Sequence, residues 1–210
     1  MEIGLGPATV AAMTRPREFD RSALLDSATD LFWARGFEGT SISDLAAVSG
    51  VGNGSLYAAF GSKLGLFMEV FERYCAGRVD VVRGVMTAPT GNARSTVERF
   101  FEVIMDDCAS HTPSWGCLML NSVAELGKSH PEVLAISGRA VAEMEALVEN
   151  RLLEAQKIER WTSDDLDVHA LSAQVVLVSQ GLLNLSLLDD SRQRLEDIAR
   201  ASSRMLPFAA

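Results

Sequence analysis

The sequence predicts an all-α protein in two parts, a small N-terminal domain of three helices and a larger helical body. Three observations support this prediction. Apolar residues recur at spacings of three and four along most of the chain, which is the period of a helix. Capping residues and breakers divide the chain into successive helices. No stretch of any length shows the strict alternation that is typical of a half-buried strand.

The composition agrees with a folded helical chain. The 210 residues are 48% hydrophobic and 22% charged and include only 6 Pro, which argues against disorder. The net charge of −9 has the wrong sign for a simple nucleic-acid coat. Residues 13–65 hold five Lys and Arg against six Asp and Glu, so the acidic excess lies in the remainder. We expect a flexible arm over 1–17, a first domain over 18–65 and a second over 66–210.

The first helix is expected over residues 20–35, and Gly36 would end it. Its inward positions are Leu24, Ala28, Leu31 and Phe32. Arg15 and Arg17 precede this helix. Basic arms in that position reach DNA in some regulators, although a solvated tail fits the same residues.

Two short helices joined by a tight turn come next. Ser41 and Asp44 form a capping box for a helix of about two turns. Gly50 can adopt the positive φ that a sharp turn between helices needs. A second short helix is expected over 53–60, where Leu56 would pack against the first. This arrangement predicts a helix-turn-helix, whose second helix enters the major groove of DNA.

A long helix should follow over 62–86, with Ser62 as its cap, and connect the first domain to the body. Five further helices are expected over 93–110, 116–127, 131–160, 164–188 and 191–205. Ser129, Pro131 and Glu132 together indicate a helix start, with the serine as the cap.

The chain lacks the sequence patterns of common enzymes. It has no P-loop, no dinucleotide-binding glycine pattern, no nucleophile elbow and no His-Glu-x-x-His. We therefore expect no enzyme activity and no cofactor. Cys108 and His111, with Cys117 nearby, form the one weak pattern for a soft metal, and we predict no metal site.

The chain is expected to be cytoplasmic. Three widely spaced cysteines do not make a disulfide framework, and no signal-peptide pattern opens the chain. The most apolar run, residues 170–188, contains Gln174, Gln180 and Asn184. A bilayer tolerates such side chains poorly, so this run is interpreted as a buried helix, with no membrane partner.

The first domain resembles the TetR/AcrR family of transcriptional regulators over about residues 18–70. The matching residues are Ala28, Phe32, Gly36-Phe37, Gly39-Thr40-Ser41, Leu45-Ala46, Gly50-Val51, Gly54, Leu56-Tyr57, Phe60, Ser62-Lys63 and Leu66. The resemblance implies a ligand-responsive homodimer. Its partners would be a palindromic double-stranded DNA operator, from which it is released as a repressor, and a small-molecule effector. The larger domain would then bind the ligand and form the dimer.

The residues expected to contact DNA are Thr40, Ser41, Gly52, Asn53, Ser55, Tyr57 and Lys63. Asn53 and Ser55 suit base edges, since an asparagine can pair bidentately with adenine. The hydroxyls of Thr40, Ser41 and Tyr57 and the ammonium of Lys63 are expected to contact DNA phosphates. The second helix departs from the family pattern because Asn53, Ala58 and Ala59 stand where basic residues or histidine are frequent. The alternative is therefore a helical ligand- or protein-binding module whose head has lost DNA binding.

The body offers candidate residues for an effector pocket and for a dimer interface. The pocket candidates are Phe100, Phe101, Ile104, Met105, Trp115 and Met119, which fit plain core equally. Cys117 lies in a Gly-Cys-Leu segment seen in one branch of the family, where it is either a thiol sensor or an inert buried cysteine. The dimer candidates are Val175, Val178, Gly181, Leu182 and Leu185, because their helix is apolar nearly all round.

Overall fold

The computed structural model describes residues 19–88, 91–109, 114–159, 161, 167–188 and 191–206. Within these ranges the secondary structure is helical apart from a single bridge residue, Trp161, which confirms the predicted all-α class. The helices are α1 (Arg21–Arg35), α2 (Ile42–Ser49), α3 (Asn53–Phe60), α4 (Lys63–Met86), α5 (Ala93–Cys108), α6 (Leu118–Leu126), α7 (Pro131–Gln156), α8 (Val168–Leu185) and α9 (Arg192–Met205).

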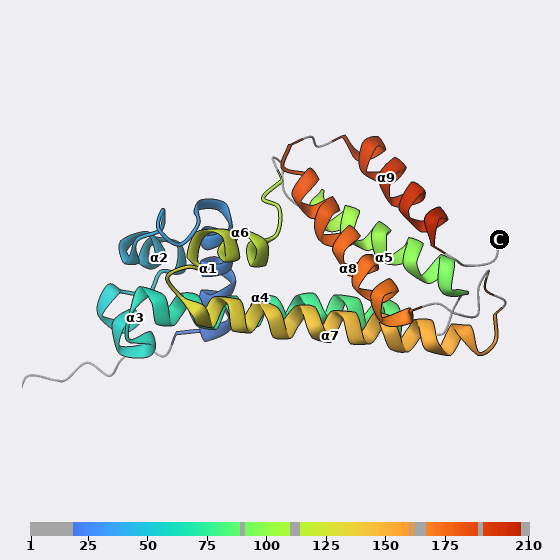
Figure 1. The fold of residues 1–210 in the computed structure, drawn as a ribbon. Helices are drawn as coiled ribbons and strands as arrows, with labels where there is room; N and C mark the ends of the chain where they lie inside the picture. The colour runs from blue at the N-terminus through green and yellow to red at the C-terminus, as the bar shows by residue number, and fades with distance from the viewer. Residues whose placement is uncertain are drawn as a thin grey trace, which may run out of the picture.

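The molecule is elongated, with a head at one end and a body at the other (Figure 1). The head consists of α1, α2 and α3. Helices α4 and α7 run side by side along the length of the body, and α5, α8 and α9 stack at the far end. Helix α6 lies between the head and this stack. The long helix α4 therefore connects the two parts, as its sequence predicts.

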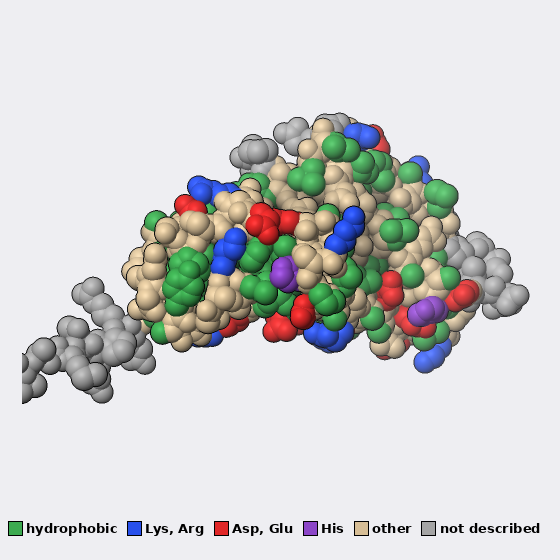
Figure 2. Space-filling model, turned by 60° about the vertical axis from the view of Figure 1, so that its left-hand side comes forward, with side chains coloured by type: hydrophobic (Ala, Val, Ile, Leu, Met, Phe, Trp, Pro, Cys, Tyr) green, Lys and Arg blue, Asp and Glu red, His purple; other side chains and the backbone are tan. Residues whose placement is uncertain are grey.

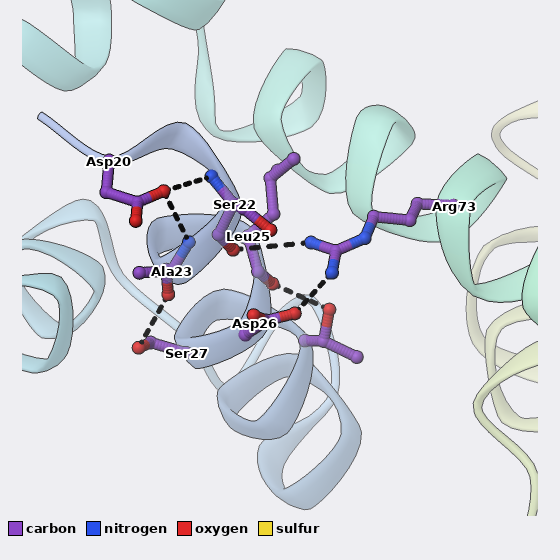
Figure 3. Close-up of polar contacts among 8 residues, drawn as sticks. Asp20, Ser22, Ala23, Leu25, Asp26, Ser27 and Arg73 are labelled. Atoms are coloured by element: carbon purple, nitrogen blue, oxygen red, sulfur yellow. Dashed lines mark hydrogen bonds and ion pairs between the residues drawn. The ribbon is translucent and has the colours of Figure 1, made fainter.

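Helix α1 is capped at its start and fastened to α4 (Figure 3). The Asp20 carboxylate accepts from the N–H groups of Ser22 at 2.9 Å and Ala23 at 3.1 Å. Arg73, on α4, donates to the Ser22 carbonyl at 3.3 Å and pairs with Asp26. These contacts fix the direction of α1 relative to the helix that carries the head.

The helix-turn-helix has the predicted caps. Ser41 and Asp44 form both bonds of a capping box, and Gly50 ends α2 with a φ of 68°. Leu45 and Leu56 are each 1% exposed, and they join the two helices through their buried sides. Helix α7 starts at residue 131 as predicted, but its predicted cap is wrong by one residue. His130 is its N-cap, while the Ser129 hydroxyl donates back to the Leu126 carbonyl.

Helix α8 is the one helix among the described residues whose length and apolar content suit a membrane span. It packs on α5, α7 and α9 within the fold, as expected for the core helix of a helical bundle. It begins four residues later than predicted, because the Asp167 carboxylate caps it by accepting from the Ala170 N–H at 3.0 Å.

Candidate functional site

The outer face of α3 is exposed and carries no charge. Asn53, Ser55 and Tyr57 all lie on the surface, and Tyr57 is 52% exposed. Gly52 precedes them as the N-cap. In Figure 2 the left-hand end of the molecule, which is the head, is mostly tan and green, with blue and red at its margins. This face can offer an amide, hydroxyls and small side chains to a groove.

The predicted contact through Thr40 needs correction, and two donors of Lys63 are engaged inside the head. Thr40 is 1% exposed, and its hydroxyl donates to the Gly36 carbonyl at 2.8 Å. The Lys63 ammonium donates to the carbonyls of Phe37 at 2.9 Å and Thr40 at 3.0 Å, and it lies 4.1 Å from the centre of the Phe37 ring. Both side chains hold the turn between α1 and α2.

The other cations of the head also have intramolecular partners. Arg21 pairs with Glu69 and lies over the Phe60 ring at 4.5 Å, and Arg35 lies 3.7 Å from Asp44. Arg21, Arg35 and Lys63 are all the Lys and Arg side chains of residues 19–65. Contacts to phosphate from this region therefore rest largely on neutral donors and on backbone amides at helix starts.

Ser41 is exposed but its hydroxyl is engaged. It accepts from the Asp44 N–H at 3.1 Å and donates to the Asp44 carboxylate. Hydrogen bonds from the Ser41 side chain and backbone hold the pKa of Asp44 below its usual value. A phosphate contact through this hydroxyl would have to displace an ionised carboxylate. Ser62 instead caps α4 by accepting from the Gly65 N–H at 2.9 Å, which leaves other amides at that helix start available.

A small cavity of ≈ 20 Å³ lies in the body between α4, α5, α6, α7 and α8. Three of the predicted pocket residues line it, namely Phe100, Ile104 and Met119. The remaining lining residues are Arg78, Val82, Cys117, Met144, Ser179, Gln180 and Leu183. A space of this size holds about one water molecule.

The other three predicted pocket residues do not reach this cavity. Phe101 and Met105 lie under an outer groove of ≈ 610 Å³ between α5 and α9, whose rim is charged. Successive residues of a helix point in different directions, so Phe100 and Phe101 face different spaces. Trp115 packs edge-on against Trp33, with ring centroids 5.9 Å apart, where the body meets the head.

One end of the cavity is polar. Arg78 donates to Asp107 at 2.8 Å, and the Tyr74 hydroxyl donates to the Cys117 sulfur at 3.6 Å. Burial raises the pKa of Tyr74 above its usual range, so the phenol remains a donor. Cys117 is 2% exposed. The buried amide nitrogen of Gln180 has no hydrogen-bond partner among the described residues, so the cavity wall contains an unused donor.

Among the described cysteine side chains, Cys75 is the other one besides Cys117. Burial raises the pKa of the Cys75 thiol to about 12, which keeps it protonated and unreactive. The side chain of Cys108 and the whole of His111 lie outside the described residues, so the soft-metal pattern is untested. No group of three His, Cys, Asp or Glu residues in the described ranges is placed to hold a metal ion.

The predicted dimer residues fall on two sides of α8. Val175 and Leu182 are each 1% exposed and belong to the core of their own protomer, so their assignment is corrected. Val178, Gly181 and Leu185 remain partly exposed. The outward side of α8 is an uncharged stripe of Ala170, Gln174, Leu177, Gly181 and Asn184, and the exposed Leu188 follows just beyond the helix. When a helix is apolar on all sides, its sequence does not show which side is buried in the core of its own protomer.

The head and body are also joined by a contact that local sequence patterns did not reveal. Glu125, near the end of α6, accepts from the backbone N–H groups of Phe37 at 3.0 Å and Glu38 at 2.8 Å. His130 packs against the Phe37 ring with centroids 6.2 Å apart. Glu125 and Phe37 are nearly ninety residues apart in the chain, and no local sequence pattern at either residue predicts their contact.

Two sequence families match the chain. Residues 24–70 match the family described as bacterial regulatory proteins, tetR family, and residues 93–202 match the tetracyclin repressor-like C-terminal domain. The HTH-type transcriptional repressor ComR of Escherichia coli is 28% identical over 92% of this chain and 91% of its own length. The HTH-type regulator YezE of Bacillus subtilis is 26% identical over 92% of this chain and 100% of its own.

Solved structures agree with the sequence matches. A cysteine mutant of the TetR family transcriptional regulator CifR, complexed with 26bp operator DNA, superposes with a TM-score of 0.77. That protein is 31% identical, and the match covers 92% of this chain and 100% of the other. The reduced form of Escherichia coli NemR has the same fold, with a TM-score of 0.80 at 19% identity over 90% of this chain and 98% of the other.

These relatives are regulators and not enzymes, and the second family alone covers more than half of the chain. Family membership favours a regulator over the alternative of a module that has lost DNA binding. The chain belongs to the TetR family and is a DNA-binding transcriptional regulator.

Proposed function

We propose that the protein is a cytoplasmic homodimeric repressor that a small molecule releases from a palindromic operator. The observation that carries this proposal is the capped helix-turn-helix, whose second helix α3 is exposed at the tip of a head that α4 connects to the body. The relative ComR is named a repressor, and the CifR structure holds operator DNA, which supports the same role here.

In this proposal α3 enters the major groove. Asn53 and Ser55 meet base edges, and Tyr57 donates to a phosphate. Amides at the start of α4, which Ser62 caps, supply further phosphate contacts. Two heads related by a twofold axis would read half-sites about 34–36 Å apart. The outward stripe of α8, together with the exposed side of α9, would form the dimer interface as a four-helix bundle.

The effector would enter the cavity beside Phe100 and Met119. That cavity, at ≈ 20 Å³, is far smaller than the ~300–1,000 Å³ of a typical ligand site. Binding must therefore separate the surrounding helices, including α4. A ligand that fits only the expanded body shifts the population away from the form that binds DNA, by a coupling of about 1–3 kcal/mol.

Cys117 offers a second way to trigger the same release. Its sulfur lies in the cavity wall, where the Tyr74 hydroxyl donates to it. Covalent modification there would add bulk to a space that holds about one water molecule. The CifR structure is a cysteine mutant and the NemR structure is a reduced form, which supports testing this thiol.

A reporter assay tests the proposal. A bacterial strain carries a reporter gene whose promoter overlaps a DNA site selected by the purified protein. Expression of the protein should lower the reporter signal, and an effector found by thermal-shift screening should restore it. A reporter signal that rises on expression would show an activator instead.

A salt titration separates the proposal from a module that does not bind DNA specifically. The logarithm of the affinity for the selected duplex should fall linearly with the logarithm of the salt concentration. The slope should be shallow, because counterions are released by Lys and Arg and this head contacts phosphates largely through neutral donors. An affinity that is equally weak for the selected and for a scrambled duplex at every salt concentration contradicts the proposal.

A further inference from the structure

The end of α6 holds the turn between α1 and α2 directly. The Glu125 carboxylate uses both oxygens, one for the Phe37 N–H and one for the Glu38 N–H. Gly36 adopts a φ of 72°, and a Cβ at this position would lie 2.9 Å from the Glu125 carboxylate. The backbone of the turn is thus shaped around a side chain that the body supplies.

The same turn is held from its other side by α4. Lys63 donates to the carbonyls of Phe37 and Thr40, so the turn lies between an anionic group from α6 and a cationic group from α4. Hydrogen bonds to charged groups are shorter and stronger than neutral ones. The orientation of the head therefore depends on the relative positions of α4 and α6.

The opposite end of α6 forms part of the cavity wall. Cys117 is the N-cap of this helix and Met119 lies in its first turn, and both line the cavity. The helix has nine residues. At ~1.5 Å per residue it is about 13 Å long, and its backbone hydrogen bonds join its two ends continuously. A displacement of its first turn therefore moves Glu125 at the other end.

We propose that Glu125 is the positioning residue that carries the state of the cavity to the DNA-binding head. Expansion of the cavity displaces the first turn of α6, and the carboxylate moves the turn between α1 and α2 with it. This inference rests on the effector response proposed above. It adds a coupling through α6 to the one through α4. In the coupling through α6, the Glu125 side chain makes the contact with the head.

A double-mutant cycle tests this inference without a known effector. Met119→Trp places a larger side chain in the cavity and pushes the first turn of α6 away from the other walls. Glu125→Gln keeps the size of the side chain but replaces one acceptor oxygen with a donor, so one of the two amides loses its partner. Glu154→Gln removes an exposed carboxylate of α7 in the body and is the matched control. Operator affinity is measured for the native protein, for each variant and for the combined Met119→Trp and Glu125→Gln protein.

Met119→Trp should weaken operator binding about tenfold in the native background but only about twofold together with Glu125→Gln. Amide exchange should rise about tenfold in Glu125→Gln at whichever of Phe37 and Glu38 loses its acceptor, since a charge-assisted bond is lost there. The control variant should change neither quantity. Thermal unfolding confirms that each variant is folded, and Leu183→Phe, which enters the same cavity from α8, replaces Met119→Trp if that chain does not fold.

Two results overturn the inference in different ways. An equal loss of affinity in both backgrounds, or unchanged exchange at the two amides, shows that coupling does not pass through Glu125, and leaves the effector response intact. A native background in which no cavity-filling variant alters operator affinity removes both this inference and the proposed effector response.

Discussion

At the scale of single residues, adjacent positions of α3 do different tasks. Leu56 is 1% exposed and anchors the helix, while Tyr57 beside it is 52% exposed. A hydroxyl on a rigid ring can contact a phosphate at little cost in conformational entropy, because few torsions are fixed on binding. The uncharged surface around it makes each neutral donor more important.

Tyr57→Phe should weaken operator binding by about 1 kcal/mol, or roughly fivefold, because one hydrogen bond is lost while the ring remains. Fluorescence anisotropy with a labelled operator duplex measures the change, and thermal unfolding should be unaltered. An unchanged affinity would remove Tyr57 from the DNA-contacting set.

Gly116 is a residue whose backbone conformation and surroundings both require glycine. Its φ is 66°, and a Cβ there would lie 2.9 Å from a Leu187 methyl group. Gly116→Ala should therefore lower the free energy of unfolding by about 1–3 kcal/mol. Gly138→Ala is the matched control because it lies in the interior of α7 with open space around it, and it should raise stability by about 0.5–1 kcal/mol. Chemical denaturation compares the two, and a Gly116→Ala protein as stable as the native one contradicts the structural reason.

Capping could be predicted from the sequence at this scale, but long-range polar contacts could not. Ser41, Asp44 and Gly50 act within a few residues of themselves, so their spacing predicts what they do. Thr40 and Lys63 resemble DNA-contacting residues in their own segment, yet both are engaged by the turn that begins at Gly36. Only the folded chain reveals such partners.

At the scale of elements, helical periodicity predicts the helices well but not what covers each face. Phe100 and Phe101 look equivalent in the sequence, and the fold directs one to the inner cavity and the other to the groove under α9. Val175 and Leu182 are likewise equivalent to their neighbours on α8 until the positions of α5 and α7 are known. Packing partners, and not propensity, decide these assignments.

The start of α8 is tied to α7 by a hydrogen-bonded pair, His169 and Glu149. A hydrogen bond from His169 to Glu149, and then the charge of that carboxylate, raise the pKa of His169 above its usual value. The pair therefore stabilises the fold at a pH below the unfolded value of ~6.5, and the stabilisation is lost as the pH rises through the folded pKa.

Glu149→Gln should accordingly lower the free energy of unfolding at pH 5.5 by more than at pH 8.5. Because both side chains are near the solvent, the difference should be small and should shrink with added salt. Urea unfolding at the two values of pH measures it, and in a His169→Gln background the difference should vanish. A larger loss of unfolding free energy at pH 8.5 than at pH 5.5 would contradict the expected pH dependence of this pair.

At the scale of the whole molecule, two heads must be held at a fixed separation for a palindrome to be read. In the proposed dimer the uncharged outward stripe of α8 would be the paired surface, and Leu177 at its centre is 68% exposed. A charge there would be buried without a partner on association, while the isolated protomer would tolerate it.

Leu177→Arg should convert the dimer to a folded monomer and abolish high-affinity operator binding. Ile158→Arg places the same charge at a more exposed position outside the stripe, 84% exposed, and should remain dimeric. Light scattering after size-exclusion chromatography gives the mass of each. A Leu177→Arg protein that stays dimeric would place the interface elsewhere.

The architecture and the family could be predicted from the sequence because the head carries its pattern in one contiguous segment, from Gly36 to Leu66. The cavity and the coupling between head and body could not. They are assembled from α4 to α8, and residues such as Gln180 and Glu125 gain their roles only through distant neighbours. The size of the cavity depends on packing that no local pattern encodes.

The most direct test of the central claim is selection of bound fragments from sheared genomic DNA by the purified protein at near-physiological salt. A protein with Tyr57→Ala and Asn53→Ala serves as the parallel control. The account predicts enrichment of a palindromic site whose half-sites are about one helical turn apart, lost in the control. A folded, dimeric protein that enriches no site, or one whose control variant enriches the same site, would contradict the claim that the exposed face of α3 reads an operator.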